Sequence, residues 1–80
     1  MSLSPFQLPE GVTIPGKYQR TVNARKWFIE GAQDGYAGRV GSTDEEGQNG
    51  LRQHQGQSAL TAYLDGYAAG KAARTKDTDR

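Results

Sequence analysis

Three glycines interrupt a stretch that otherwise has the composition of a helix, "EGAQDGYAGR" from Glu30 to Arg39. Gly31, Gly35 and Gly38 follow one another at spacings of four and three residues. A glycine inside a helix costs about 1 kcal/mol relative to alanine, because glycine loses more backbone freedom on folding. A helix at this position therefore needs packing that only glycine allows, and this requirement limits the folds open to the chain.

A second stretch repeats the pattern at an offset of 35 residues. The segment "WFIEGAQDGYAGR" aligns with "AYLDGYAAGKAAR", which brings an aromatic, an aliphatic and an acidic residue, two glycines and an arginine into register. The repeat indicates two versions of one helical unit. We expect helices at residues 21–38 and 58–74, joined by a Gly- and Gln-rich linker at residues 39–57. Either Thr21 or Asn23 can cap the first helix.

The glycines of each unit form a stripe, because residues three and four apart share one helix face. The two stripes are Ala24, Phe28, Gly31, Gly35 and Gly38, and Ala59, Tyr63, Gly66, Gly70 and Ala73. Each stripe is bulky at its N-terminal end and bare at its C-terminal end. A parallel pair of aligned helices would clash at one end and leave a void at the other.

An antiparallel pair would instead lay the bulk of each helix over the bare part of its partner. Phe28 and Trp27 would then cover Gly70, and Tyr63 would cover Gly35. The pattern therefore predicts an all-α fold, a small antiparallel two-helix hairpin with a glycine-spaced interface. It also predicts that Gly35→Leu unfolds the protein.

The segments outside the two helices differ from them in composition. Residues 1–20 contain all three prolines and indicate an extended, proline-rich arm. The linker has room for a short helical turn, but Gly47 and Gly50 argue against a long helix there, and Gly47→Ala should be tolerated. Residues 75–80, "TKDTDR", are expected to form a disordered, solvated tail.

Composition limits the size and the location of the protein. Eighty residues make at most one domain, and only twelve are Leu, Ile, Val or Phe, so the core is small and a homodimer is one possibility. Without cysteine, a disulfide or a cysteine-based zinc site is excluded. The first residues lack a basic start and a long apolar run, and no segment approaches a membrane span. We therefore expect a cytoplasmic protein with no signal peptide and no membrane contact.

Catalytic chemistry has little support in the sequence. His54 is the only histidine, so a metal pair or a nucleophile–base pair cannot draw on a second one. Asp44, Glu45 and Glu46 are neighbours in the linker, where a solvated patch is more common than an acid–base pair. "GYAAGKA" has one residue too few between its glycines for a phosphate-binding loop. We expect a non-enzymatic protein with no cofactor and no metal.

Two short motifs carry the glycines: Gly31-x3-Gly35-x2-Gly38-Arg39, and later Tyr63-Leu64-x-Gly66-Tyr67 with a closing Arg74. These motifs resemble those of the ribosome modulation factor family, over about residues 24–74. The resemblance implies two helices joined by a connector. It also implies a protein that binds the small ribosomal subunit and favours inactive, dimerised ribosomes in starving cells. This chain differs from that family in its near-neutral charge and its longer, acidic connector.

Cationic residues flank tyrosines along one face of each expected helix. Seven residues form this candidate site for RNA or another partner: Arg25, Lys26, Tyr36, Arg39, Tyr67, Lys71 and Arg74. Tyrosines beside cations suit stacking on unpaired bases and contact with phosphates. We therefore expect a ribosome- or rRNA-binding modulator of translation.

A purely structural interpretation of the same face stays open. In it, Ile29, Leu64 and Tyr67 form a second core face. The arm then covers this face with Phe6, Leu8 and Ile14. The basic residues are in that case an ordinary solvated fringe, which is common on protein surfaces.

A protein partner is the other open interpretation. Small proteins with glycine-spaced helices also occur among phage and mobile-element products, and this one could be an inhibitor or adaptor of a host protein complex. Its binding surface would be the arm together with Trp27, Ile29, Tyr36 and Tyr67. Salt separates the two functions, because RNA binding weakens steeply with salt whereas a mostly apolar interface does not.

Overall fold

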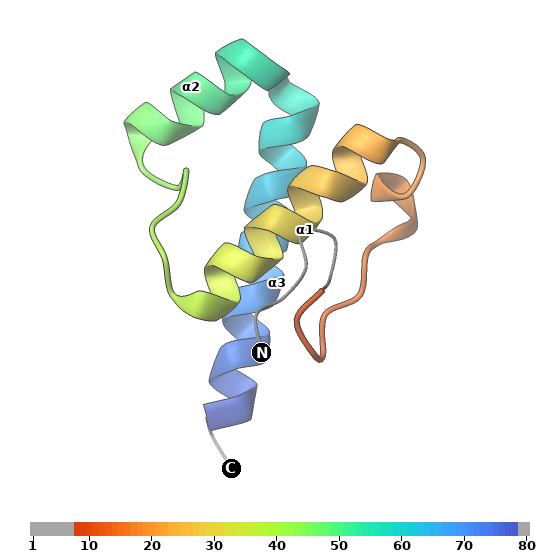
Figure 1. The fold of residues 1–80 in the computed structure, drawn as a ribbon, viewed down its shortest axis with the longest axis vertical. Helices are drawn as coiled ribbons and strands as arrows, with labels where there is room; N and C mark the ends of the chain where they lie inside the picture. Colours follow the sequence, from red (N-terminus) through yellow and green to blue (C-terminus); the bar gives the residue numbers. More distant parts are fainter. Residues whose placement is uncertain (1–7, 79–80) are drawn as a thin grey trace.

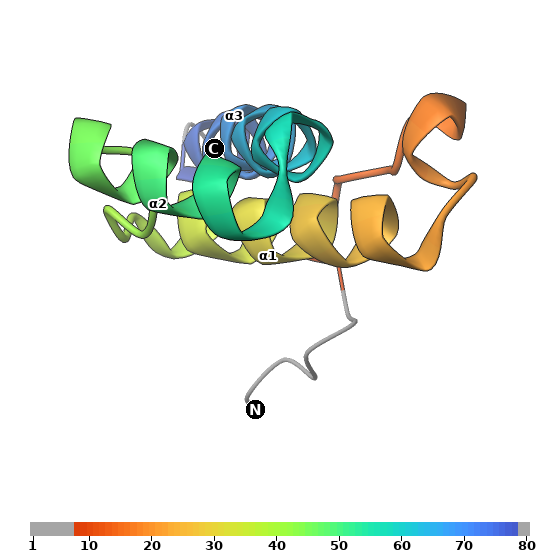
Figure 2. The same cartoon turned by 90° about the horizontal axis from the view of Figure 1, so that it is seen from above.

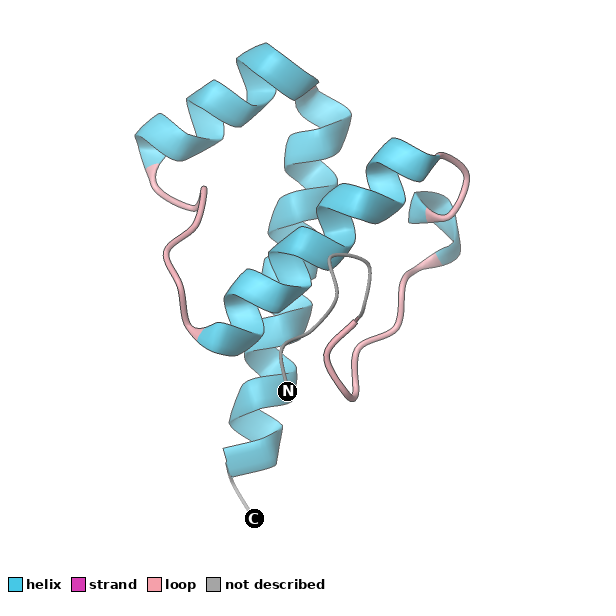
Figure 3. Cartoon of the chain, in the orientation of Figure 1, coloured by secondary structure: helices cyan, strands magenta, loops and turns pink. Residues whose placement is uncertain are grey.

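Within residues 8–78 the chain forms three α-helices and one short 3₁₀ helix (Figures 1 and 3). The computed structural model describes the backbone of residues 8–78 and the side chains of residues 8–76. In chain order the elements are η1 (Gly16–Tyr18), α1 (Val22–Ala37), α2 (Glu45–Gln55) and α3 (Gln57–Thr78). The predicted all-α class is confirmed, although there is one helix more than expected. None of the described helices is long and apolar enough to cross a membrane.

α1 begins where its sequence predicts and ends one residue before Gly38. The Thr21 hydroxyl accepts a hydrogen bond from the Ala24 amide at 3.1 Å, so Thr21 and not Asn23 is the N-cap. Gly38 ends the helix with a φ of 76°, a left-handed conformation that glycine adopts without strain. A Cβ atom at Gly38 would meet nothing within 4 Å. Gly38 therefore ends α1 and does not contribute to the helix packing for which it was predicted.

The linker contains a full helix, α2, which the sequence interpretation missed. The Asp44 side chain caps it by accepting a hydrogen bond from the Gly47 amide at 2.9 Å. Acidic residues occupy its first turn and basic residues its last turn, so both ends of the helix dipole are compensated. Leu51 is its one buried residue and packs against α3. These interactions offset the cost of Gly47 and Gly50 in a helix. That cost was the reason for expecting no long helix in the linker.

α3 extends beyond its predicted bounds at both ends. It starts at Gln57, directly after Gly56, whose φ of 100° lets the chain turn sharply from α2. It continues to Thr78, so the prediction of a disordered tail is wrong for residues 75–78. Residues 79–80 lie outside the described residues.

α1 and α3 run in the same direction where they cross (Figure 1). A Cβ atom at Gly31 would overlap the carbonyl oxygen of Tyr63, and one at Gly35 would overlap that of Tyr67, four residues further along both helices. Contacts that advance together along two helices define a parallel pair. The predicted antiparallel direction is therefore wrong. α2 makes the parallel arrangement possible, because it carries the chain back to the end where α1 began (Figure 1).

The contacts at the crossing repeat under the 35-residue offset of the sequence. A Cβ atom at Gly66 would overlap the carbonyl oxygen of Phe28, and one at Gly70 would overlap that of Ala32. Gly70 thus faces Ala32, and not Phe28 or Trp27 as expected. Such close approach lets Cα–H groups face carbonyl oxygens across the interface, as at other small-residue helix crossings. The glycine-spaced interface is confirmed, with a pseudo-twofold relation between its two helices.

Two hydrophobic clusters flank this crossing, one completed by the arm and the other by α2, which lie on opposite sides of the helix pair (Figure 2). On one side an arm-side cluster contains Phe28, Ala32 and Ala62 from the helices with Val12 and Tyr18 from the arm. On the other side an α2-side cluster contains Leu51, Leu60 and Tyr63. Because the helices cross at an angle, their bulky ends diverge and the clash expected of aligned parallel helices is avoided. The arm and α2 fill the space left on each side.

The described part of the arm packs on the arm-side cluster. Leu8 and Ile14 are partly buried there, as is Ala73 of α3, which was predicted to pack in the helix stripe. The arm therefore does not cover the face of Ile29, Leu64 and Tyr67, and the structural interpretation proposed for that face is wrong for Leu8 and Ile14. Phe6, its third member, lies outside the described residues.

Tyr18 joins the arm to α3. Its hydroxyl donates a hydrogen bond to the Asp65 carboxylate, and its ring centroid lies 5.5 Å from that of Phe28. Lys17 Nζ lies 3.9 Å from the same carboxylate. Burial and the hydrogen bond to Asp65 together raise the pKa of Tyr18 from 10.0 to about 12.

This raised pKa predicts a loss of stability at alkaline pH. The folded protein holds the Tyr18 proton more tightly than the unfolded chain does, so this contribution to stability is complete below pH 10 and is lost as the pH rises through about 12. We expect the free energy of unfolding, measured by denaturant titration, to fall over that interval. The fall should be smaller in Tyr18→Phe; an equal fall in both proteins would show that Tyr18 does not anchor the arm.

Candidate functional site

Five of the seven predicted binding residues gather at the end of the molecule where α1 finishes. The Tyr67 hydroxyl donates a hydrogen bond to the Arg39 carbonyl at 2.5 Å, and the Arg74 guanidinium donates one to the Tyr36 carbonyl at 3.1 Å. A Cβ atom at Gly35 would lie 3.0 Å from the Lys71 amide nitrogen, so this residue also borders α1. We call this group the cationic cluster: Tyr36, Arg39, Tyr67, Lys71 and Arg74.

Arg74 has both a structural role and a cationic one within this cluster. It hydrogen-bonds to one of the last carbonyls of α1, which have no partner inside the helix. Its guanidinium carbon lies 5.6 Å from the centroid of the Tyr36 ring, which is the geometry of a cation–π contact. The side chain is exposed, so a flat, positively charged group stands over an aromatic ring at the surface.

Arg39 is held by Asp34, a residue that sequence reasoning did not assign to the site. Its Nε and one of its terminal nitrogens each lie 2.9 Å from the same Asp34 oxygen. The other Asp34 oxygen accepts a hydrogen bond from the Tyr63 hydroxyl at 2.5 Å, and the Ser42 amide donates to that hydroxyl at 3.0 Å. Burial, with the hydrogen bond to Asp34 next in size, raises the pKa of Tyr63 well above its usual range. This network fixes the loop that follows α1.

Tyr67 serves packing more than binding. Its ring is half-buried against the α2-side cluster, 6.4 Å from that of Tyr63 between centroids, and its hydroxyl is bound to Arg39. A ring held in this way offers little surface on which a base can stack. Within the cluster, Tyr36 is therefore the better candidate for stacking, since the guanidinium of Arg74 lies over its ring.

Arg25 and Lys26 lie apart from the cationic cluster, near the start of α1. They border a separate hollow of about 300 Å³ together with Val22 and Ile29. Lys26 Nζ lies 5.3 Å from the centroid of the neighbouring Trp27 ring. The structure therefore does not join all seven predicted residues into one binding face.

The apolar surface expected for a protein partner is not exposed. Ile29 is only 3% exposed, and Trp27, Tyr36 and Tyr67 are half-buried. Trp27 packs against both clusters. Among the described residues, the exposed large apolar side chains are instead Val22, the first residue of α1, and Val40, which follows the end of α1.

Metal-binding groups are also not assembled among the described side chains of residues 8–76: no three His, Cys, Asp or Glu residues there lie close enough to hold an ion. Comparisons with protein-family models, with curated proteins and with solved structures found no match. The function therefore has to be inferred from the chain's own residues. At the site these supply exposed cations, one paired carboxylate and an aromatic ring.

Proposed function

We propose that this protein is a small, non-enzymatic RNA-binding protein that modulates translation by binding the ribosome. The observation that supports this most strongly is the cationic cluster, in which Arg39, Lys71 and Arg74 are all exposed at one end of the helix pair. The choice of the ribosome as the target comes from the glycine motifs that resemble ribosome modulation factors.

The parallel crossing explains how cations of two helices reach the same end. Arg39 follows the end of α1, while Lys71 and Arg74 lie in the second half of α3. In an antiparallel hairpin, the ends of α1 and α3 would be at opposite ends of the molecule. Three cations within one small surface can contact neighbouring phosphates, and the guanidinium of Arg74 over Tyr36 can stack on an unpaired base or bind a phosphate through two hydrogen bonds.

Co-sedimentation with bacterial ribosomes at two salt concentrations tests this proposal. Three phosphate contacts predict that affinity falls about twenty- to fortyfold between about 50 and about 200 mM salt, because each contact releases counterions. We expect the protein to pellet with the small subunit at the lower concentration. Failure to pellet there would reject ribosome binding, and salt-independent pelleting would favour a protein component as the partner.

Lys71→Gln tests the cationic cluster itself, because Lys71 is exposed and its side chain is not part of the hydrogen-bond network around Asp34. We expect affinity for the ribosome to fall about three- to tenfold, with a smaller salt dependence and unchanged thermal stability. Arg52→Gln on α2 removes the same charge away from the cluster and should change affinity by less than about twofold. Equal losses in the two variants would show that net charge, and not this cluster, drives binding.

A further inference from the structure

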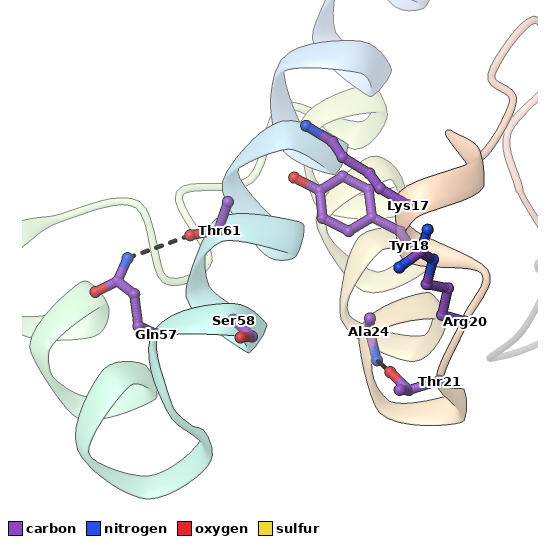
Figure 4. Close-up of a pocket in the computed structure, with 8 residues that line it drawn as sticks. All are labelled: Lys17, Tyr18, Arg20, Thr21, Ala24, Gln57, Ser58 and Thr61. Atoms are coloured by element: carbon purple, nitrogen blue, oxygen red, sulfur yellow. Dashed lines mark hydrogen bonds between the residues drawn. The ribbon is translucent and has the colours of Figure 1, made fainter.

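A hollow of about 450 Å³ opens at the other end of the helix pair, between η1 and the first turns of α1 and α3 (Figure 4). It is separate from the cationic cluster and shares no residue with it. Its lining contains two cations, three hydroxyl groups of Ser and Thr, one amide and no carboxylate. The lining residues are Lys17, Tyr18, Arg20, Thr21, Ala24, Gln57, Ser58 and Thr61.

Hydrogen-bonding side chains of both helices line this hollow. The Thr21 oxygen accepts from the Ala24 amide, which leaves its own proton available to donate (Figure 4). The Thr61 oxygen likewise accepts from the Gln57 side chain at 3.2 Å. Tyr18 directs its hydroxyl to Asp65 and presents its ring to the hollow. The lining thus combines the Tyr18 ring with the hydroxyl groups of Thr21 and Ser58, while the Thr61 hydroxyl is turned toward Gln57 (Figure 4).

The charge around the hollow is positive. Lys17 Nζ lies 3.9 Å from the Asp65 carboxylate and forms an ion pair with it. Arg20, in contrast, has no hydrogen bond or ion pair with another described residue. The first turns of α1 and α3 contain no acidic residue, in contrast to that of α2. The N-terminus of α1 adds its partial positive charge at this end, whereas that of α3 directly follows the C-terminus of α2, whose partial negative charge offsets it.

We propose that this hollow binds a phosphate group. Lys17, Arg20 and the Thr21 hydroxyl supply donors for its oxygens, and the volume leaves room for the molecule that carries the phosphate, along Tyr18 toward Ser58. The carrier is either a free phosphorylated small molecule or a nucleotide within an RNA strand. The same phosphate chemistry serves both, and experiment separates them.

Backbone amide shifts of the whole protein in NMR titrations test this assignment. The probes are inorganic phosphate, adenosine monophosphate, adenosine and a short single-stranded RNA, all at constant ionic strength set with chloride. We expect saturable shifts at Thr21, Gln57 and Ser58 with the phosphate-bearing probes, at millimolar affinity or better for the small ones, and none with adenosine. Shifts with adenosine monophosphate identify a free phosphorylated molecule; shifts with RNA alone identify a nucleic-acid strand.

Arg20→Gln is the variant that decides the matter, since Arg20 is exposed and its loss should leave the fold intact by circular dichroism. We expect Arg20→Gln to lower the affinity for the phosphate-bearing probes at least fivefold. The matched Arg25→Gln, in the same region of α1 but outside the lining of the hollow, should leave this affinity unchanged. The proposal is overturned if none of the phosphate-bearing probes shifts the lining residues, or if Arg20→Gln binds as well as the unaltered protein. Lys71→Gln should not alter these shifts, so failure here is distinct from failure of ribosome binding at the cationic cluster.

Discussion

Gly35→Ala is expected to unfold the protein, or to destabilise it by about 3 kcal/mol or more, although the change adds only one methyl group. The new Cβ would overlap the Tyr67 carbonyl oxygen and lie 2.9 Å from its carbon. That obstacle is helix backbone, which cannot move aside as a side chain can. The two helices would have to separate, and both hydrophobic clusters would loosen. By helix propensity alone, alanine at this position would stabilise the protein by about 1 kcal/mol. The packing contact with Tyr67 therefore decides whether the substitution stabilises or destabilises the protein.

Gly50→Ala in α2 is the matched control, because a Cβ there would meet nothing within 4 Å. We expect this variant to gain up to about 1 kcal/mol. Gly47→Ala is not a suitable control, since its Cβ would lie 2.7 Å from Ser42 Cα, and the expectation that this change is tolerated is contradicted by the structure. Denaturant titrations followed by circular dichroism compare the variants. If Gly35→Ala were as stable as the unaltered protein, the close crossing of α1 and α3 would be wrong.

The glycine spacing predicted the interface but not the direction of its helices. The four contacting glycines, Gly31, Gly35, Gly66 and Gly70, were identified correctly, since only close backbone approach explains them. The choice of an antiparallel pair assumed helices aligned along their whole length. Crossed helices touch over a short region, so their bulky ends need not meet. Direction then depends on α2, a helix that rests on the Asp44 cap and on the burial of Leu51.

The candidate site was predictable only in part, because its composition depends on the direction in which α1 and α3 pair. Arg39 and Arg74 end two copies of one repeat, so a parallel pair brings them to the same end, whereas Arg25 lies a full helix length away. Asp34 forms an ion pair with the nearby Arg39, but the Tyr63 hydroxyl that donates to it is 29 residues away, so no local pattern indicates the network around it. The hollow beside Arg20 depends on where the arm folds back, and no periodic pattern encodes that.

Tyr63→Phe is expected to destabilise the protein by about 2–3 kcal/mol while keeping the ring that fills the α2-side cluster. Tyr63 is 2% exposed, and its hydroxyl is the point at which α1, α3 and the loop after α1 meet. Without this hydroxyl, the Asp34 carboxylate loses a donor at 2.5 Å and the Ser42 amide loses its acceptor at 3.0 Å. A hydrogen bond to a charged group and a half-buried amide left unpaired both contribute to the loss.

Tyr67→Phe makes the same chemical change four residues further along α3 and separates this network from the general effect of removing a tyrosine hydroxyl. Its hydroxyl has one partner, the carbonyl of the exposed Arg39, which water can satisfy in the variant. We expect a loss of about 1 kcal/mol or less. Hydrogen exchange of the Ser42 amide should accelerate in Tyr63→Phe and stay unchanged in Tyr67→Phe. Equal destabilisation of the two variants, with Ser42 protected in both, would mean that Tyr63 contributes through its ring alone and that another contact holds the loop after α1.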